Sequence, residues 1–301
     1  MGLSLNTNIS ALVAQRNLAS STNAMNKALE RLTTGFKINR ASDNAANYSI
    51  MRNWEAKLSS LDVAAENTAT GTDLASTAES SLEKIQEHLK RIRDITEQAA
   101  NGTYDDASRK AMATEVKSRL EEIDRISDAA EFNGVHLLDG SVQSNINIQV
   151  GTDSQSYSQI SLDQSLFADA DSLNLFSSAT HLASGNTTIE EIAESLTGYD
   201  LVNDQASTTA VPHDALQDID DVINNISGKL TQIGSYQNRF ESATDSIAVQ
   251  IQNITSALST IKDADVAKES TNYIQAQIMQ QAATTLLATA NQNASIALNL
   301  I

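Results

Sequence analysis

LQDIDDVINNISGKLTQIGSYQNRFESATDSIAVQIQNITSALSTI, residues 216–261, is the stretch that decides the fold. Its apolar residues recur at alternating spacings of three and four, the pattern of a helix that buries one stripe against partner helices. This stripe consists of Leu216, Ile219, Ile223, Ile226, Leu230, Ile233, Phe240, Ile247, Ile251, Ile254, Leu258 and Ile261. Only Gln237 and Thr244 place polar side chains in it. One helix of this length would be roughly 70 Å long, so the stretch predicts a rod rather than a compact globule.

Residues 82–92 and 112–123 carry two shorter apolar stripes of the same kind. Between them, residues 101–105 read NGTYD, in which the glycine favours a helix end and the aspartate can cap the next helix. These two segments can pack against residues 216–261 as antiparallel neighbours. The predicted fold class is therefore mainly α, a long antiparallel helical rod or coiled-coil bundle.

The middle of the chain, from about residue 131 to 211, is rich in Ser, Thr, Asn, Asp and Gly. Apolar residues at 135–138 precede the pair Asp139–Gly140, and residues 146–150 then alternate between apolar and polar. Alternation on both sides of an Asp-Gly pair predicts a β-hairpin. For residues 153–211 we expect a short accessory domain of mixed or irregular structure, which a Gly/Ser linker could replace.

Both terminal segments combine apolar stripes with very few charges, and residues 271–301 carry no charged side chain. Such helices are poorly solvated, so we expect them to be buried against each other and against other copies. A membrane-surface helix is the alternative, but the basic polar face of such helices is missing. The residues expected to drive self-assembly are Leu5, Ile9, Leu12, Met25, Leu29, Leu32, Ile274, Ile278, Leu286, Leu287, Ile296 and Leu300.

Composition excludes several classes of function. The formal net charge is −18, and residues 126–228 contain sixteen acids and no Lys or Arg, which disfavours nucleic acid as a partner. No cysteine is present, which removes disulfides and thiolate chemistry. No apolar run is long enough for membrane insertion, and no signal-peptide core is apparent. These features alone predict a cytoplasmic protein.

No motif of an enzyme is found. His88, His136, His181 and His213 form no metal-binding spacing, and the sequence has no nucleophile elbow, dinucleotide fingerprint or phosphate loop. Adjacent acids such as Glu190–Glu191 are expected by chance in so acidic a stretch. We therefore predict no catalytic, metal-binding or cofactor-binding residue, and no cofactor.

Several long blocks resemble bacterial flagellins. They are SLNTNISALVAQRNL (4–18), LERLTTGFKINRASDNAANYSI (29–50), LKRIRDITEQAANGTY (89–104), EIDRISDAAEFNGVHLLDG (122–140), GSYQNRFESA (234–243) and QAATTLLATANQNASIALNLI (281–301). The resemblance covers roughly residues 1–152 and 212–301. One departure is the segment Asn293–Ala294, where flagellin tails often carry a proline.

The resemblance implies a structural subunit of the extracellular flagellar filament, used for motility and secreted through the flagellum's own channel. It implies three regions: a terminal coiled-coil core of residues 1–42 and 264–301, a helical rod with the hairpin of residues 43–152 and 212–263, and a variable outer domain of residues 153–211. The implied partners are other copies of the chain, an export chaperone and the export apparatus, and the cap and hook-associated proteins.

The resemblance also implies a contact with an innate immune Toll-like receptor in some family members. In this chain the matching positions are Leu89, Arg91, Ile95 and Glu115. Arg91 and Ile95 are four residues apart and share one helical face, and Glu115 follows on the next helix. Ile95 stands where receptor-activating flagellins usually have Leu.

Two alternative functions remain at this stage. A hook–filament junction protein shares terminal helices of this kind, although the ASDNAANYSI, FNGVHLLDG and ANQNASIALNLI segments favour flagellin. A soluble intracellular coiled-coil regulator or chaperone belongs to a different class, and its termini would be expected to carry charge.

Overall fold

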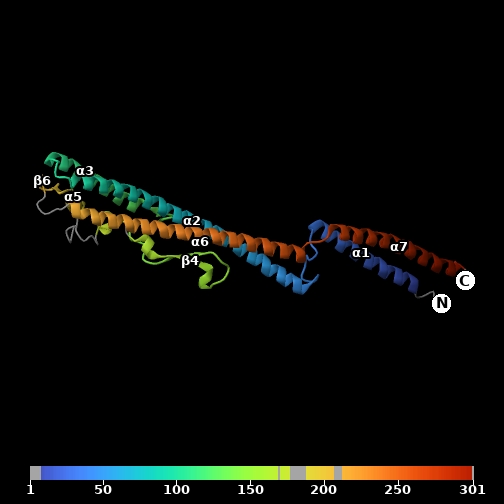
Figure 1. Ribbon diagram of the computed structural model, residues 1–301. Coiled ribbons are helices and arrows are strands. Elements are labelled where there is room, and N and C mark those ends of the chain that lie inside the picture. Colours follow the sequence, from blue (N-terminus) through green and yellow to red (C-terminus); the bar gives the residue numbers. More distant parts are fainter. Residues whose placement is uncertain (1–7, 169, 177–187, 207–211, 300–301) are drawn as a thin grey trace. The chain divides into compact units, whose positions relative to one another are not determined.

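A computed structural model describes residues 8–168, 170–176, 188–206 and 212–299 (Figure 1). The chain forms two compact units, one of residues 1–59 with 250–301 and the other of residues 60–249. We call them the terminal unit and the central unit. The long helices α2 (Ala45–Ala99) and α6 (Pro212–Lys262) contribute residues to both.

The terminal unit pairs two antiparallel helices, α1 (Ile9–Thr34) and α7 (Val266–Asn299). The Asn8 side chain caps α1 by accepting a hydrogen bond from the Ala11 amide at 3.0 Å. Gly35 ends α1 in the left-handed region at φ 74°, a conformation that glycine adopts without steric cost. Beyond it the Lys37 amide donates to the Lys262 carbonyl at 2.7 Å, and the Ala264 amide donates to the Gly35 carbonyl at 2.8 Å.

The central unit has one hydrophobic core, to which α2, α6 and α3 (Asp106–Ala129) contribute. Asp105 caps α3 by accepting from the Ser108 amide at 2.9 Å, as the NGTYD segment predicted. The core positions of residues 82–92 are fully buried, as are Val116, Leu120 and Ile123, while Met112 at the start of the second stripe is half-buried; this confirms both shorter stripes. On α6 the buried members of the long stripe in this unit are Ile219, Ile226, Ile233, Phe240 and Ile247.

Leu216, Ile223 and Leu230 of the long stripe are half-buried in the central unit, and where the stripe enters the terminal unit none of its members is fully buried. Ile251, Ile254, Leu258 and Ile261 are only half-buried there. At the two polar positions of the stripe, the Gln237 amide donates to Glu79 Oε2 of α2 at 2.6 Å, whereas the Thr244 hydroxyl donates to the Phe240 carbonyl of its own helix at 3.0 Å. The stripe is therefore one continuous pattern with two different degrees of burial.

The hairpin predicted around Asp139–Gly140 is wrong. Strand β1 (Glu131–Phe132) instead pairs with β2 (Val135–His136) around Asn133–Gly134, both of which have positive φ. Strand β3 (Ile146–Gln149) pairs with β4 (Gln159–Leu162), antiparallel and with Ile146 opposite Leu162. The alternation at 146–150 does mark a strand, but the partner of this strand lies later in the chain.

Residues 153–206 form several short elements. They are the 3₁₀ turns η1 (Ser156–Ser158) and η2 (Gln164–Phe167), helices α4 (Ser172–Leu175) and α5 (Ile189–Thr197), and the paired strands β5 (Tyr199–Asp200) and β6 (Gln205–Ala206). Helix α5 starts with a capping box between Thr188 and Glu191. Leu166, Phe167, Ile192 and Leu196 are buried in the same core as α2, α3 and α6. Much of this segment is thus integrated into the central unit.

Candidate assembly surface

Small side chains form the contact between α1 and α7. The buried residues of α1 are Ala14, Ser21 and Ala28, which are seven apart. On α7 the buried residues are also seven apart: the small Ala276 and Ala283, and the larger, charged Glu269. Small residues once per heptad let two helix backbones approach closely, so little room is left for large side chains between them. We call this contact the small-residue seam.

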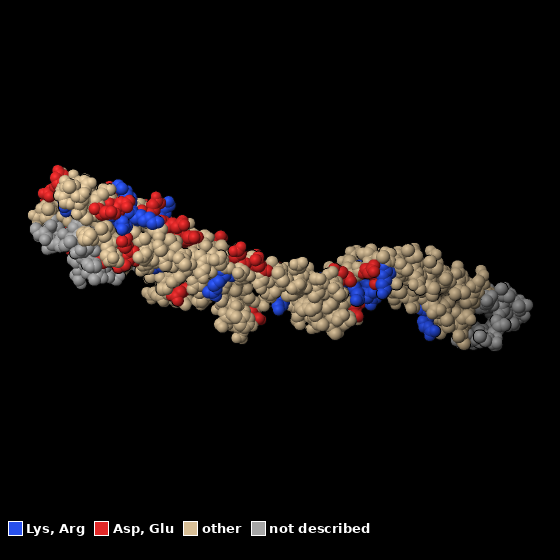
Figure 2. Space-filling model, viewed as in Figure 1, with Lys and Arg blue, Asp and Glu red and all other residues tan. Residues whose placement is uncertain are grey.

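Because the small-residue seam admits little bulk, many large apolar side chains of this pair face outward. Ile9, Leu12, Leu29, Ile274, Ile278 and Leu286 are exposed, while Met25, Leu32 and Leu287 are half-buried. Leu5, Leu300 and the side chain of Ile296 lie outside the described residues. Figure 2 shows α1 and α7 almost without charged side chains on the face in view.

Three further large apolar residues, Val13, Val266 and Met279, are exposed on the same helices and were missed by the sequence reasoning. They lie outside the stripes that were read as amphipathic, so periodicity gave no signal for them. Together with the exposed residues above, they make an apolar surface that one chain does not cover. Large exposed apolar patches commonly mark contacts with other molecules.

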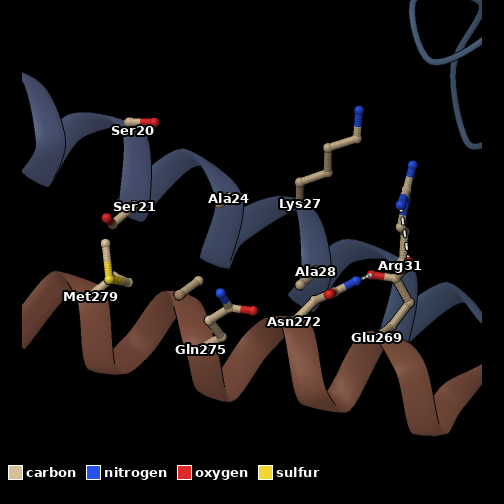
Figure 3. A pocket seen from close by; sticks show the side chains of 11 residues that line it. Ser20, Ser21, Ala24, Lys27, Ala28, Arg31, Glu269, Asn272, Gln275 and Met279 are labelled. Atoms are coloured by element: carbon tan, nitrogen blue, oxygen red, sulfur yellow. Dashed lines mark hydrogen bonds and ion pairs between the residues drawn. The ribbon is translucent and has the colours of Figure 1, made fainter.

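A groove of about 340 Å³ lies between α1 and α7. Figure 3 shows Glu269 of α7 bonded to Arg31 of α1 and to Asn272 of its own helix, while Lys27 points away from α7. Arg31 Nη1 donates to Glu269 Oε1 at 3.0 Å, and Asn272 Nδ2 donates to Glu269 Oε2 at 3.2 Å. Glu269 is only 7% exposed, and each of its carboxylate oxygens accepts a hydrogen bond from a protein side chain, as buried polar groups generally require.

The expected receptor positions on α2 and α3 are only partly available. Leu89 and Ile95 are buried in the core, which corrects the expectation that they contribute to a contact surface. Both side chains belong to the hydrophobic core of the central unit. They lie on the apolar face of α2, which is turned toward the neighbouring helices, and are therefore hidden from a partner protein. Arg91 and Glu115 are half-exposed, and Arg91 Nε donates to Glu115 Oε1 at 3.1 Å.

The Glu115 carboxylate also accepts from Arg119 at 3.0 Å. Burial by itself would raise the pKa of Glu115, but the hydrogen bonds from Arg119 and Arg91 outweigh burial and lower it. Glu115 therefore stays ionised at neutral pH, and the patch presents one carboxylate between two guanidinium groups.

No catalytic constellation is apparent in the described part of the chain. Among those residues no group of three or more His, Asp or Glu side chains could hold a metal ion. The hydrogen bond from Tyr199 to Asp204 at 2.8 Å raises the pKa of Tyr199 to about 12, away from the range useful for proton transfer at neutral pH. Within the same residues no helix is long and apolar enough to cross a membrane.

The family model for the bacterial flagellin N-terminal helical region matches residues 5–143, and that for the C-terminal helical region matches residues 216–301. The flagellin of Bacillus subtilis is 31% identical to this chain, with 99% of each chain covered. Polar flagellin F of Vibrio parahaemolyticus is 30% identical, with 100% of each covered. A solved structure described as a flagellar hook-associated protein from Vibrio parahaemolyticus matches with a TM-score of 0.57 and 19% identity, covering 73% of this chain and 100% of that one, which shows a shared fold alone. The chain belongs to the bacterial flagellin family.

Proposed function

We propose that the outward faces of α1 and α7 are the surface through which this subunit packs against other copies in the filament. Bacterial flagellins are structural subunits that self-assemble into the extracellular flagellar filament for motility. Relatives named as flagellins match over the whole chain, which favours this function over a hook–filament junction protein. The observation that supports the surface is the set of large apolar residues left exposed beside the small-residue seam.

The energetics favour burial of this surface between copies. Each large apolar side chain that passes from water to a protein interior contributes about 1.5–3 kcal/mol. Charges would oppose such burial, and α7 carries none after Glu269. An interface assembled from several of these side chains can offset the entropy lost when copies associate.

The test uses charged substitutions on this surface and a matched substitution elsewhere. Leu12→Asp and Ile278→Asp change residues that are 65% and 60% exposed, so the single chain should keep its helical circular dichroism. Each should prevent filament growth from seeds, because a buried, unpaired carboxylate is costly. Val202→Asp is the control, since Val202 is 75% exposed in the central unit.

Electron microscopy and sedimentation of the polymer give the result. Filaments from Leu12→Asp and Ile278→Asp with normal length and yield would refute the proposed surface. Loss of filaments in Val202→Asp as well would show that any new charge blocks assembly, and the proposal would lose its support.

We further propose that accessory proteins cover the apolar faces of α1 and α7 before assembly. A chain with this much exposed apolar surface is prone to self-association, so an export chaperone is the expected partner before secretion through the export apparatus. Cap and hook-associated proteins would meet the same faces at the filament ends. If so, Ile278→Asp should reduce both chaperone capture and assembly, whereas Val202→Asp should leave capture by the purified chaperone unchanged.

The contact with a Toll-like receptor is proposed in a reduced form, limited to Arg91 and Glu115. Both side chains are half-exposed and already ordered by their ion pair, which lowers the entropy cost of binding. Arg91→Ala should weaken receptor binding by the monomer by about 1–3 kcal/mol. Arg125→Ala is the matched control, because Arg125 forms a comparable exposed ion pair with Glu122 on the same helix as Glu115. Equal receptor-reporter activation by all these monomers would contradict the proposal.

A further inference from the structure

The small-residue seam does not by itself define how far α1 lies along α7. Its members are all Ala or Ser except one, and on α7 the spacing continues to Ala290, seven residues further on and half-buried. Sliding one helix by seven residues, about 10 Å, would place small residues against small residues again. Packing alone therefore distinguishes weakly between the observed register and two slid ones.

Three side-chain contacts mark the observed register. Asn8 Nδ2 donates to the Ala290 carbonyl at 2.9 Å, Gln280 Nε2 donates to Thr22 Oγ1 at 3.2 Å, and Arg31 pairs with Glu269 at 3.0 Å. The first two join neutral groups that could find water or another partner in a slid register. The third involves a carboxylate that is nearly completely buried.

Glu269 is the one member of the seam that is not small, and in the observed register it pairs with Arg31. A slide in one direction would carry it to the middle of α1, away from Arg31. A slide in the other would carry it past the end of α1 and place Ala276 against Arg31. Both registers lose the Arg31–Glu269 pair. In the first, the nearest cation to Glu269 would be Lys27, which points away from α7 and pairs with Asp43, so a buried carboxylate would lose its partner at a large cost.

The position of the pair also suits the two helix ends. Arg31 lies in the last turn of α1 and Glu269 in the first turn of α7. Each charge therefore complements the helix dipole at its own helix end, as well as the other charge. No other acid is present on α7, so no second pairing of this kind is available to it.

We infer that the Arg31–Glu269 ion pair selects the register of α1 against α7. The pair acts in the way that a single buried polar residue fixes register in a coiled coil. The inference rests on the proposed function in one respect: the register sets where Leu12 of α1 lies relative to Ile278 of α7, and so sets the pattern of the assembly surface.

A second feature holds the same register and must be separated from the first. An isolated backbone bridge joins Phe36 to Asp263, next to the hydrogen bonds of Gly35 and Lys37. If this bridge were sufficient, removal of the ion pair would leave the register unchanged. The two explanations thus predict opposite results for variants at Arg31 and Glu269.

Disulfide trapping gives the register directly, because the chain has no cysteine of its own. Thr22→Cys with Gln280→Cys reports the observed register. Thr22→Cys with Leu287→Cys, or with Tyr273→Cys, reports the two slid registers. Each pair is oxidised in the full-length soluble chain below the concentration at which filaments form, so the result does not depend on polymerisation. The cross-linked fraction is measured by gel shift and peptide mass spectrometry.

Each cysteine pair is placed in four backgrounds: the parent chain, Arg31→Ala/Glu269→Ala, the charge swap Arg31→Glu/Glu269→Arg, and the control Arg40→Ala. The control removes an exposed ion pair with Glu30 in the same unit. In the parent chain and the control, the reporter of the observed register should exceed either slid reporter by about tenfold or more, equivalent to about 1.4 kcal/mol. The alanine pair should bring the reporters to within about threefold of one another, and the charge swap should restore the preference.

An alanine pair that keeps the parent ratio would assign the register to the backbone bridge and overturn the inference. So would a parent chain in which the reporter of the observed register does not predominate. Failure of the proposed assembly surface would appear instead as normal filaments from Leu12→Asp, whatever the cross-linking shows.

Discussion

Thr96 and Thr68 lie on the same helix, α2, and both are completely buried, yet their hydroxyl groups differ. Thr68 donates to the Ala64 carbonyl at 2.7 Å, whereas Thr96 has no hydrogen-bond partner among the described residues. Thr96→Val should therefore raise the free energy of unfolding by about 1 kcal/mol, because it removes an unsatisfied buried group and keeps the shape. Thr68→Val should not stabilise. Urea unfolding followed by circular dichroism measures both, and equal changes would contradict the assignment.

Gly71 on α2 marks a close approach to α6. A Cβ atom added there would lie 2.9 Å from Phe240 Cζ and 3.2 Å from Ile148 Cγ2, both in packed surroundings. Replacing a helical glycine by alanine normally stabilises by roughly 0.5–1 kcal/mol. Gly228→Ala on α6 meets no neighbour and should show that gain, whereas Gly71→Ala should destabilise the chain. If the thermal midpoints rose equally for both variants, Phe240 and Ile148 would have to move aside for the new methyl group without destabilising the fold, and the prediction would be wrong.

At the scale of the helix, burial of the α6 stripe predicts two different responses to the same substitution. Ile226 is fully buried in the central unit, whereas Ile254 is half-buried in the terminal unit. Ile226→Asp should lower the free energy of unfolding by about 3–5 kcal/mol, since its carboxylate would have no partner. Ile254→Asp should cost clearly less, because water can reach the new charge. Chemical denaturation of the single chain decides this, and a larger loss for Ile254→Asp would contradict the burial pattern.

The junction of α2 and α6 in the terminal unit gives a pH-dependent prediction. Lys262 Nζ lies 2.8 Å from Glu55 Oε1, and this hydrogen bond lowers the pKa of Glu55 below its ordinary 4.5 despite the opposing effect of burial. A carboxyl with a lowered folded pKa stabilises fully above its unfolded pKa, and this stability is lost as the pH falls through the folded pKa. Glu55→Gln should lower the thermal midpoint at pH 7, and the difference should narrow below pH 4.5.

Glu87→Gln is the control for this measurement, because Glu87 pairs with Lys84 on an exposed face where solvent screens the charges. Its midpoint should stay close to that of the parent chain at both pH values. A Glu55→Gln difference that widened on acidification would contradict the sign.

The helices were predictable from the sequence because their signal is local and repeated. Every turn between Leu216 and Ile261 adds evidence for the same face, so single exceptions such as Gln237 do not obscure it. The strand partners were not predictable in this way. Asp139–Gly140 is a good turn pair in isolation, but β3 gains its partner from a segment beyond it, and a local pattern cannot identify that choice.

The seam between α1 and α7 shows a different limit. The sequence reasoning assigned the contact to bulky stripes, whereas Ala14, Ser21 and Ala28 occupy it. Alanine is common on every face of a helix, so a heptad spacing of alanines does not by itself predict which face is buried against a partner helix. The two charged residues of this contact, Arg31 and Glu269, carried no signal at all, because they lie far apart in the sequence.

For the whole molecule, the structure changes the expected outcome of removing residues 155–208. The sequence predicted that a Gly/Ser linker could replace them. Phe167, Ile192 and Leu196 are buried in the core of the central unit, and their loss would leave cavities and expose apolar surface of α3 and α6. We now expect the replaced chain to unfold at a clearly lower temperature. Filaments of normal thermal stability from the replaced chain would support the original expectation.

The alanine-rich contact between α1 and α7 has a consequence for how these helices respond to dilution. A pair that keeps its small side chains inside and its large ones outside has too little enclosed apolar area to be strongly held by itself. If neighbouring copies cover the outward faces as proposed, they add stability to a pair that is already formed in the single chain, and mass action couples this added stability to assembly. The thermal stability of the paired terminal helices should therefore rise with protein concentration, while that of the central unit, which encloses its own core, should not change with it.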